Sequence, residues 1–291
     1  MSKREFNTCS VIIPAYNAAG SILKTIESAL TQTRPPDEIV VADDGSSDNT
    51  SELAESMGVK VLRLENGGPG RARNAAAQAS TGELLFFLDA DDTWQPNKIE
   101  MHLLAHQVAE PQPSFVFDLT QRIRPDGRFS GIAGVGRPGV VHWTEMLDSK
   151  NWTCGSCPSM PRVVFEAIGG FNESLWFAED VEFLMRAGHQ CGPGWRLNEV
   201  GTFYQLTGGS LSRKQHDPAP TLRIFKERLP YLTGEQEAQV LTTVVMVNAL
   251  HAPPGRYLAA FAPMGLRILR ERRFYRFMAL RVLNAMGLRP I

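Results

Sequence analysis

The sequence has no long hydrophobic run, and this shortage narrows the classes of protein to which it can belong. No apolar stretch among the 291 residues approaches the ~18 residues of a membrane-spanning helix, so no such helix is expected. Between Lys3 and Pro14 the only apolar run is V-I-I, so we expect no secretory signal. With 43% hydrophobic and 21% charged residues, the composition is typical of a soluble globular protein, which we expect in the cytoplasm.

Cysteine is also scarce, with four residues in the chain. Cys9 and Cys191 are isolated, whereas Cys154 and Cys157 form a C-G-S-C motif. This motif has no second pair to complete a zinc site, and it does not open a helix after the first strand as redox motifs do. The pattern therefore favours small buried thiols in a reducing compartment.

Net charge is nearly absent, because the formal value is −1, and this argues against nucleic acid as a partner. The charge is unevenly spread: residues 256–291 carry eight arginines and one acid, which is +7 and leaves −8 for the rest. Apolar and aromatic residues lie among these arginines. The stretch from about 264 to 286 is either a basic amphipathic helix lying peripherally on the inner face of a membrane, or a helix packed on its own domain or on a second copy in a homo-oligomer.

The first ninety residues alternate between short β-branched runs and segments with helical spacing of apolar residues. Strands are predicted at 9–13, 38–42, 59–64 and 83–88, and helices at 21–30, 48–57 and 70–80. Strand–helix alternation with short connections predicts a parallel sheet covered on both faces.

The pattern loosens after residue 92. A helix is predicted at 96–108, a hairpin at 114–131, helices at 162–171 and 179–190, and a strand at 195–206. Helical segments follow at 219–229, 235–250, 255–271 and 273–286. We therefore expect one α/β domain over residues 1–217, with parts at 8–110 and 111–217, and a helical C-terminal extension over 218–291.

Acidic and small polar residues gather where three predicted strands end. The ends read P-A-Y-N at 14–17, D-D-G-S-S-D-N-T at 43–50 and D-A-D-D at 89–92. In open α/β sheets, ligands bind outside the carboxyl ends of the strands. The last group crowds three carboxylates into four positions, where like charges repel. A solvated turn that caps a helix at Asp92 or Thr93 would tolerate this, but three such ends at one edge favour a divalent cation.

Five motifs in register resemble a known family. They read S-V-I-I-P-A-Y-N-A-A-G-S-I, D-E-I-V-V-A-D-D-G-S-S-D-N-T, N-G-G-P-G-R-A-R-N-A-A, L-L-F-F-L-D-A-D-D and F-A-E-D-V-E-F. Their order and spacing are similar to those of the inverting, family 2 glycosyltransferases of the GT-A fold. The resemblance covers roughly residues 8–212. It implies a Rossmann-like α/β fold with a mostly parallel central sheet and helices on both faces, and the helical extension lies outside it.

The resemblance also implies a nucleotide-sugar site and, most often, a UDP-sugar donor. The residues expected to line this site are Pro14, Ala15, Tyr16, Asn17, Asp43, Asp44, Gly45, Arg73, Asp89, Ala90 and Asp91. Among them, Arg73 looks like the residue that meets the diphosphate or the base. Asp89 and Asp91 look like the D-x-D pair that holds the ribose and a divalent cation, Mn²⁺ or Mg²⁺. Asp180 looks like the catalytic base, with Glu179 beside it.

The chain departs from the family pattern in one loop. The segment Y-Q-L-T-G-G-S-L-S at 204–212 matches a family loop that often reads Y-R-x-H, and here Gln205 and Thr207 replace the arginine and the histidine. A positive charge and a third protein ligand to the metal are therefore missing at these positions. Arg213 and Lys214 are the candidates for supplying the charge.

The chemistry of the residues agrees with this reading. A departing diphosphate develops negative charge that a hard cation stabilises, and an acceptor hydroxyl needs a base to take its proton. We expect metal-dependent, inverting sugar transfer to a glycan or lipid-linked acceptor, in glycan or surface polysaccharide biosynthesis. Two alternatives remain: a nucleotide-binding protein of the same fold with weak or no turnover, and, less favoured, a sugar-phosphate nucleotidyltransferase. The latter needs a Gly-rich, Arg-containing loop after the first strand, and P-A-Y-N-A-A-G-S lacks it.

Overall fold

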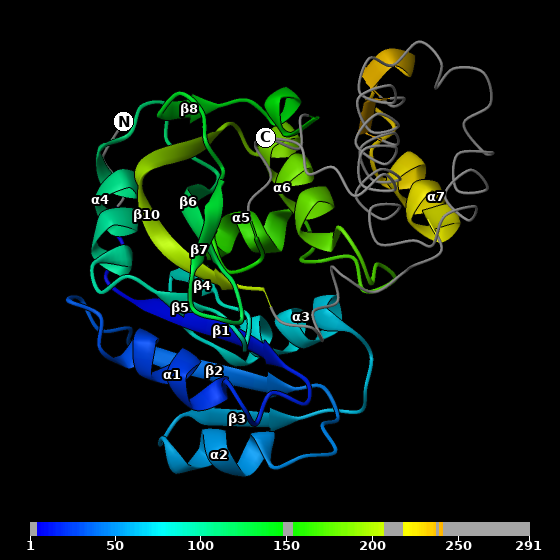
Figure 1. Cartoon of the computed structure of the whole chain (residues 1–291). Coiled ribbons are helices and arrows are strands. Elements are labelled where there is room, and N and C mark those ends of the chain that lie inside the picture. Colours follow the sequence, from blue (N-terminus) through cyan, green and yellow to red (C-terminus); the bar gives the residue numbers. More distant parts are fainter. Residues whose placement is uncertain (1–4, 148–153, 207–217, 237–238, 241–291) are drawn as a thin grey trace, which may run out of the picture. The chain divides into compact units, whose positions relative to one another are not determined.

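The computed structural model describes residues 5–147, 154–206, 218–236 and 239–240 of the 291-residue chain (Figure 1). The chain divides into two compact units. The first comprises residues 1–146 with 150–207, and the second comprises 147–149 with 208–291. Among the described residues, no helix combines the length and the apolar character needed to cross a membrane.

The first half of the first unit is a parallel sheet with helices between its strands. The strands are β1 (Cys9–Ala15), β2 (Glu38–Asp43), β3 (Lys60–Arg63) and β4 (Leu84–Phe87), in the spatial order β3-β2-β1-β4. The helices are α1 (Ile22–Leu30), α2 (Thr50–Ser56) and α3 (Pro69–Ala79). Every predicted strand and helix of this region is confirmed. All residues of β1 and β4 are buried, as expected for strands covered on both faces.

The second half adds further strands to the same sheet, which becomes a mixed sheet of ten strands. The added strands are β5 (Thr93–Trp94), β6 (Val116–Ile123), β7 (Phe129–Ala133), β8 (Gly139–Val141), β9 (Ser159–Pro161) and β10 (Gly194–Gln205). β6 and β10 are parallel to each other, whereas β9 pairs antiparallel to β4 and joins the two halves. The β6–β7 pairing confirms the predicted hairpin.

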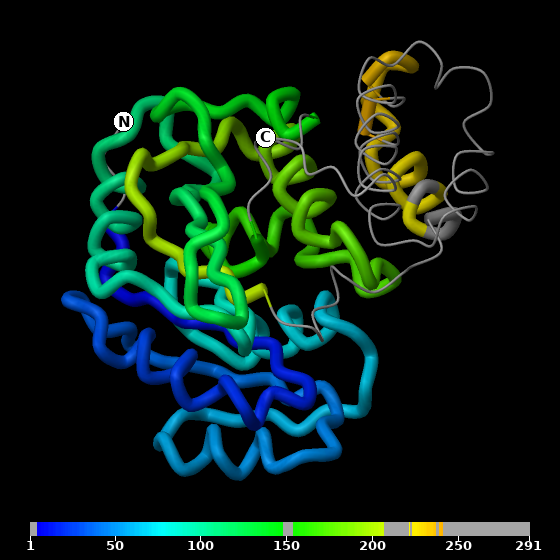
Figure 2. Tube along the Cα trace, in the orientation of Figure 1, coloured from blue at the N-terminus to red at the C-terminus, as the bar shows by residue number. Residues whose placement is uncertain are grey.

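The helices of this half follow the predicted segments closely. They are α4 (Lys98–Val108), α5 (Arg162–Ala167) and α6 (Glu179–Gln190), with a 3₁₀ turn, η1, at Trp143–Leu147. In Figure 2 the Cα trace is blue to cyan in the first half of this unit and green to yellow-green in the second half. Sequence reasoning missed β5, β8 and β9, because strands of two or three residues are too short to display a period of two.

The second unit contains α7 (Pro218–Arg228), which confirms the helix predicted at 219–229. The helices predicted at 255–271 and 273–286 lie outside the described residues, as does most of the one predicted at 235–250. The domain boundary at residue 217 stays a prediction.

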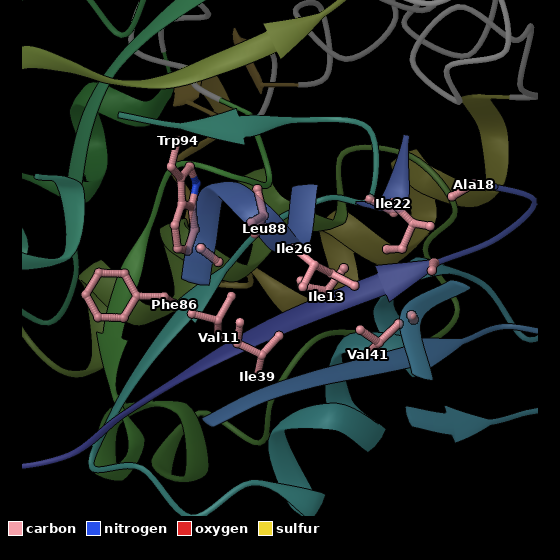
Figure 3. Close-up of a cluster of buried hydrophobic side chains, with 14 of the residues drawn as sticks. Val11, Ile13, Ala18, Ile22, Ile26, Ile39, Val41, Phe86, Leu88 and Trp94 are labelled. Atoms are coloured by element: carbon pink, nitrogen blue, oxygen red, sulfur yellow. The ribbon is translucent and has the colours of Figure 1, made fainter. Parts of the chain in front are cut away.

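An apolar core binds α1 to the sheet (Figure 3). Val11 and Ile13 of β1 lie beside Ile39 and Val41 of β2, and Ile22 and Ile26 of α1 cover them. These strand positions are two apart and these helix positions are four apart, so each set lies on one face of its element. Burial of such side chains contributes about 1.5–3 kcal/mol each. The core therefore holds the carboxyl ends of β1 and β2 at one rigid edge.

A second interior cluster is polar and entirely buried. Lys98 of α4 forms an ion pair with Asp118 of β6, and both side chains are fully inaccessible to solvent. His102 donates or accepts at both ring nitrogens, to Asp118 at 3.0 Å and to Ser159 at 2.8 Å. Burial, the main cause, and the charge of Lys98 lower the pKa of His102 to about 4. This histidine is therefore neutral near pH 7, and the cluster ties α4, β6 and β9 together.

Candidate functional site at the carboxyl ends of the strands

The ends of β1 and β2 are joined by hydrogen bonds between the loops that follow them. Pro14 and Ala15 end β1 in the buried sheet, and Ala15 pairs with Asp43. Tyr16 follows with 52% of its surface exposed, and the Asn17 backbone N–H donates to the Ser46 hydroxyl at 2.8 Å. The motifs P-A-Y-N and D-D-G-S therefore lie side by side, as the sequence predicts.

Asn17 has a positive φ of 48°, in the left-handed region that costs energy for a non-glycine residue. Its side-chain Oδ1 accepts the Ser47 N–H at 2.8 Å, which holds the residue in this conformation. Gly45 also has a positive φ, of 78°, and a Cβ there would lie 3.0 Å from the Asn66 nitrogen. The loop after β2 therefore requires glycine at this position, and the turn shape follows from it.

Asp43 and Asp44 are both buried, and their carboxylates organise the surrounding loops. Asp43 accepts the Ser46 N–H at 2.9 Å and the hydroxyl of Ser51. Asp44 accepts the backbone N–H groups of Gly67 and Gly68, each at 2.8 Å. Asp44 thereby fixes the N-G-G-P-G loop that leads into α3. That these two acids also contact a nucleotide stays a prediction.

The acidic turn after β4 divides its carboxylates between two environments. The side chain of Asp89 is 25% exposed, whereas Asp92 is fully buried. Asp92 accepts the Ser156 hydroxyl and the Gln205 N–H, the latter at 2.9 Å. Burial, followed by the charges of Asp91 and Asp89, raises the pKa of Asp92 well above its ordinary value. Asp92 therefore joins the acidic turn to Ser156 and Gln205 in the interior of the protein. It does not cap a helix, because β5 follows it directly.

The backbone of this turn is held against α1. The Thr25 hydroxyl donates to the Ala90 carbonyl at 2.9 Å and to the Asp92 carbonyl at 2.8 Å. The Ser21 hydroxyl donates to the same Ala90 carbonyl at 2.8 Å. Asp91 lies between these anchored residues and is partly buried. Ser21, just before α1, and Thr25, within it, therefore hold the backbone that carries the predicted D-x-D pair.

Arg73 is the residue that joins the acidic turn to α6. It is buried, with Nη2 2.6 Å from Asp89 Oδ1 and Nη1 2.7 Å from Glu179 Oε1. Its guanidinium also lies 5.2 Å from the centre of the Phe171 ring. The two carboxylates overcome the effect of burial and raise the pKa of Arg73. The resemblance places Arg73 beside a diphosphate or base, and in the structure both of its terminal nitrogens already bind carboxylates.

Glu179 and Asp180 open α6 under backbone strain. Ala178, just before the helix, has a positive φ of 58° and is not a glycine. Burial, and then the charge of Glu179, raise the pKa of Asp180 to about 7, while the charge of Arg73 opposes them. A carboxylate that titrates near neutral pH can take a proton from an alcohol more readily than an ordinary aspartate. The role of Asp180 as catalytic base stays a prediction.

The described residues contain no group of three or more His, Cys, Asp or Glu side chains arranged to hold a metal ion. The predicted ligands Asp89 and Asp91 supply two carboxylates. Mg²⁺ and Mn²⁺ prefer oxygen ligands, and they often bind one or two carboxylates with substrate phosphates and waters. The partly exposed Asp89 carboxylate fits this kind of site, whereas the buried and hydrogen-bonded Asp92 does not.

Comparison with known proteins finds a family model that matches the region of this site. Residues 10–133 match the family model described as Glycosyl transferase family 2. The first part of the chain is therefore similar to this family of glycosyltransferases. The matched span contains the ends of β1, β2 and β4, and so all of the residues predicted to bind the nucleotide-sugar.

Relatives among curated proteins support the family 2 assignment. An uncharacterized glycosyltransferase of Rickettsia bellii is 28% identical over 89% of this chain and 34% of its own length. One of Rickettsia prowazekii is 32% identical, over 60% and 56%. The chondroitin synthase of Pasteurella multocida is 29% identical, over 71% and 20%. The chain thus spans between a fifth and just over half of the length of these relatives.

Solved structures give the same fold. The S. aureus TarS fragment 1–349 in complex with UDP-GlcNAc superposes with a TM-score of 0.66 and 22% identity, over 86% of this chain and 75% of that one. The same fragment with UDP has a TM-score of 0.58 and 20% identity, over 96% and 92%. Together with the family-model match, this structural likeness confirms the predicted α/β fold of the GT-A type.

Sequence reasoning missed two residues that shape the site, and it named a third, Gln205, only as the replacement of a family arginine. Ser156 and Gly155 contact the acidic turn, and Gln205 donates its backbone N–H to Asp92. Gly155 and Ser156 belong to the C-G-S-C motif, but the prediction made from this motif concerned only its cysteines. The contact of Gln205 with Asp92 could not be predicted, because a backbone donor has no side-chain signature.

Proposed function

We propose that this family 2 protein is a metal-dependent, inverting glycosyltransferase that moves a sugar from a nucleotide-sugar to an acceptor hydroxyl. The observation that carries the proposal is the position of Arg73. It binds Asp89 of the acidic turn and Glu179 at the start of α6, and so brings the predicted donor site and the predicted base together. Such a transfer needs both at one place, because the leaving group and the nucleophile act on the same carbon.

Asp180 would act as the general base. Its carboxylate would take the proton of the acceptor hydroxyl as that oxygen attacks the anomeric carbon, and the diphosphate would leave from the opposite face. This in-line arrangement inverts the anomeric centre. The pKa of about 7 suits the step, because a useful fraction of Asp180 is ionised near neutral pH while the carboxylate is more basic than usual.

Asp89 and Asp91 would hold the divalent cation, Mn²⁺ or Mg²⁺. Bound there, the cation would supply positive charge to the diphosphate as it departs. Arg73 would hold Asp89 in position rather than neutralise the site, because it shares its charge with Glu179. The remaining ligands would come from phosphate and water, as Mg²⁺ sites commonly have.

The donor we propose is a UDP-sugar. The TarS structures that share the fold contain UDP-GlcNAc and UDP, which supports UDP as the first nucleotide to test. The acceptor we propose is a glycan or a lipid-linked glycan precursor in surface polysaccharide assembly. Relatives named chondroitin synthase and hyaluronan synthase support a saccharide acceptor.

The arginine-rich segment 256–291 lies outside the described residues, and its role is proposed from sequence alone. We place the enzyme at the cytoplasmic side of a membrane, with this segment lying on anionic lipid. The competing proposal is that the segment packs on its own chain or on a second copy.

Release of UDP from a panel of UDP-sugars tests the function. The protein is incubated with Mn²⁺, each UDP-sugar and simple glycoside acceptors, and UDP is quantified by a coupled assay. We expect release with at least one sugar, and loss of release in Asp180→Asn. If UDP binds but neither variant nor wild type turns over any donor, the alternative of an inactive nucleotide-binding protein is correct. The replacements Gln205 and Thr207 are the sequence features that favour this alternative.

A further inference from the structure

The C-G-S-C motif, residues 154–157, forms a loop that contacts the acidic turn, residues 89–92. The Asp89 backbone N–H donates to the Ser156 hydroxyl at 2.9 Å, and that hydroxyl donates in turn to the buried carboxylate of Asp92. One side chain therefore fixes both ends of the four-residue turn that carries the D-x-D pair. The two partners lie about sixty-five positions away in the chain, so this contact exists only in the folded protein.

Gly155 contributes by having no side chain. A Cβ at this position would lie 2.6 Å from Arg73 Nη2 and 2.8 Å from Asp89 Oδ2. Both distances are shorter than real Cβ contacts allow, and the two atoms belong to an ion pair with little room to move, because Arg73 is buried. Any larger residue would therefore push Arg73 and Asp89 apart. The glycine is needed for this close approach and not for its backbone conformation.

Cys157 anchors this loop to the buried polar cluster of Lys98 and Asp118. Its thiol donates to Asp118 Oδ1 at 2.9 Å, and its carbonyl accepts the Lys98 ammonium at 2.8 Å. Burial, and next the charge of Asp118, raise the pKa of this thiol to about 12, so it stays protonated and remains a donor. The Ser156 carbonyl is held as well, because it accepts the Trp94 indole N–H at 2.9 Å. The loop thus rests on the buried polar cluster and faces the acidic turn.

We propose that residues 154–157 are a positioning loop for the predicted cation and nucleotide site. Gly155 admits the Arg73–Asp89 ion pair, and Ser156 sets the backbone of Asp89 relative to Asp92. Cys157 fixes the loop through its contacts with Asp118 and Lys98. The inference rests on the proposed function for the identity of the ligand, whereas the contacts themselves do not depend on it.

Calorimetric titration with UDP at a series of Mn²⁺ concentrations tests the loop. Gly155→Ala adds one carbon, and Gly20→Ala is the matched control, because a Cβ at Gly20 meets nothing within 4 Å. We expect Gly155→Ala to raise the Mn²⁺ concentration for half-maximal UDP binding by about 10-fold or more, the usual effect of losing a residue that orients a metal ligand. Gly20→Ala should leave it unchanged. An unchanged midpoint in folded Gly155→Ala would overturn the proposal.

A double-mutant cycle separates this proposal from the proposed function. The melting temperature is measured for Gly155→Ala in the wild-type background and in Asp89→Ala, where the carboxylate that meets the new carbon is gone. We expect a smaller loss of melting temperature in the second background. If wild-type protein binds no UDP with Mn²⁺, the proposed function fails, and the cycle alone decides the loop. Equal losses in both backgrounds would overturn it.

Ser156→Ala provides a second route if Gly155→Ala does not fold. It removes an oxygen instead of adding a carbon, and it should also raise the Mn²⁺ midpoint, because the backbone of Asp89 loses its partner. Wild-type behaviour in this variant would overturn the role of Ser156. Cys157→Ala removes the thiol that donates to Asp118 Oδ1, so it should also raise the Mn²⁺ midpoint. A wild-type midpoint in folded Cys157→Ala would overturn the anchoring role of Cys157.

Discussion

Arg73 Nη2, on α3, lies 2.6 Å from Asp89 Oδ1 in the acidic turn, and the two residues are sixteen positions apart in the sequence. The same guanidinium reaches Glu179, more than a hundred residues further along the chain. Through these two ion pairs, Arg73 sets the distance between the acidic turn and the start of α6. In the proposed reaction this distance is the separation of the donor's diphosphate from the base, so Arg73 is a structural determinant of the chemistry even without touching a substrate.

Arg73→Gln is expected to destabilise the protein by about 3–5 kcal/mol, nearer the lower figure because Asp89 is partly exposed and its carboxylate can be hydrated. The cost arises because two carboxylates lose a buried cationic partner. Urea denaturation measures it. Arg71→Gln is the control: Arg71 lies on the same helix and donates to the Glu65 carbonyl at the surface, so its loss should cost under about 0.5 kcal/mol. Equal costs for the two variants would contradict the bridging role.

Asp180→Asn is expected to reduce kcat by roughly 10²–10⁴-fold and to change UDP affinity by no more than a few-fold. The amide keeps the size of the carboxylate but cannot take a proton. Steady-state kinetics and calorimetry measure the two quantities. Retention of near wild-type turnover would place the base elsewhere, and Glu179→Gln is the next variant to measure.

The dependence of turnover on pH follows from the raised pKa of Asp180. Because the ionised form is the base, wild-type kcat should rise with pH and level off above the pKa of about 7. The charge of Arg73 lowers this pKa, so its removal in Arg73→Gln should move the midpoint to higher pH. A pH–rate profile of both proteins decides the point. A midpoint near 4 in the wild type, or one that falls in the variant, would be inconsistent with the assignment.

Removal of divalent cations is expected to weaken UDP binding strongly. Asp89 and Asp91 place negative charge where the diphosphate must lie, so without a cation the two repel. Calorimetry with Mn²⁺ and with EDTA compares the affinities, and Asp91→Asn should show a raised requirement for Mn²⁺. Equal affinity in both conditions would exclude a metal role for these two carboxylates.

Lys98→Met is expected to lower the free energy of unfolding by about 3–5 kcal/mol, because it leaves the buried Asp118 carboxylate without its cation. Lys60→Met is the matched control, since the Lys60 side chain is exposed and its ammonium binds a surface carbonyl at 2.6 Å. Urea denaturation of both variants tests the difference. A loss under 1 kcal/mol in Lys98→Met would mean that the neighbouring histidine and hydroxyl groups stabilise the carboxylate on their own.

The arginine-rich C-terminal segment is expected to bind anionic vesicles at low salt. Each arginine near such a surface contributes on the order of 1 kcal/mol, and added salt should weaken binding by screening. Vesicle flotation of the full chain and of a chain truncated at residue 263 measures the contribution. Failure of the full chain to float, or equal flotation of the two, would support packing of the segment on protein instead.

The local pattern of the sequence was sufficient to predict most elements of the first unit. Alternating β-branched and helical segments placed β1 to β4 and α1 to α3 correctly, because side-chain periods of two and 3.6 are local properties of the chain. It also predicted that acidic strand ends meet at one edge, since parallel strands present their carboxyl ends together. The short strands β8 and β9 escaped prediction, because pairing with distant neighbours, and not their own residues, makes them strands.

The sequence by itself determined the α/β architecture, the acidic edge and the resemblance of those motifs to one family. Tertiary structure alone decided what each acid does. Asp92 accepts hydrogen bonds from Ser156 and Gln205, and Asp44 accepts them from the loop before α3. Arg73 forms ion pairs with Asp89 and Glu179. The physical reason is that burial and hydrogen-bond partners set the role of a carboxylate, and some of these partners lie more than a hundred residues away in the chain. No local period records such contacts.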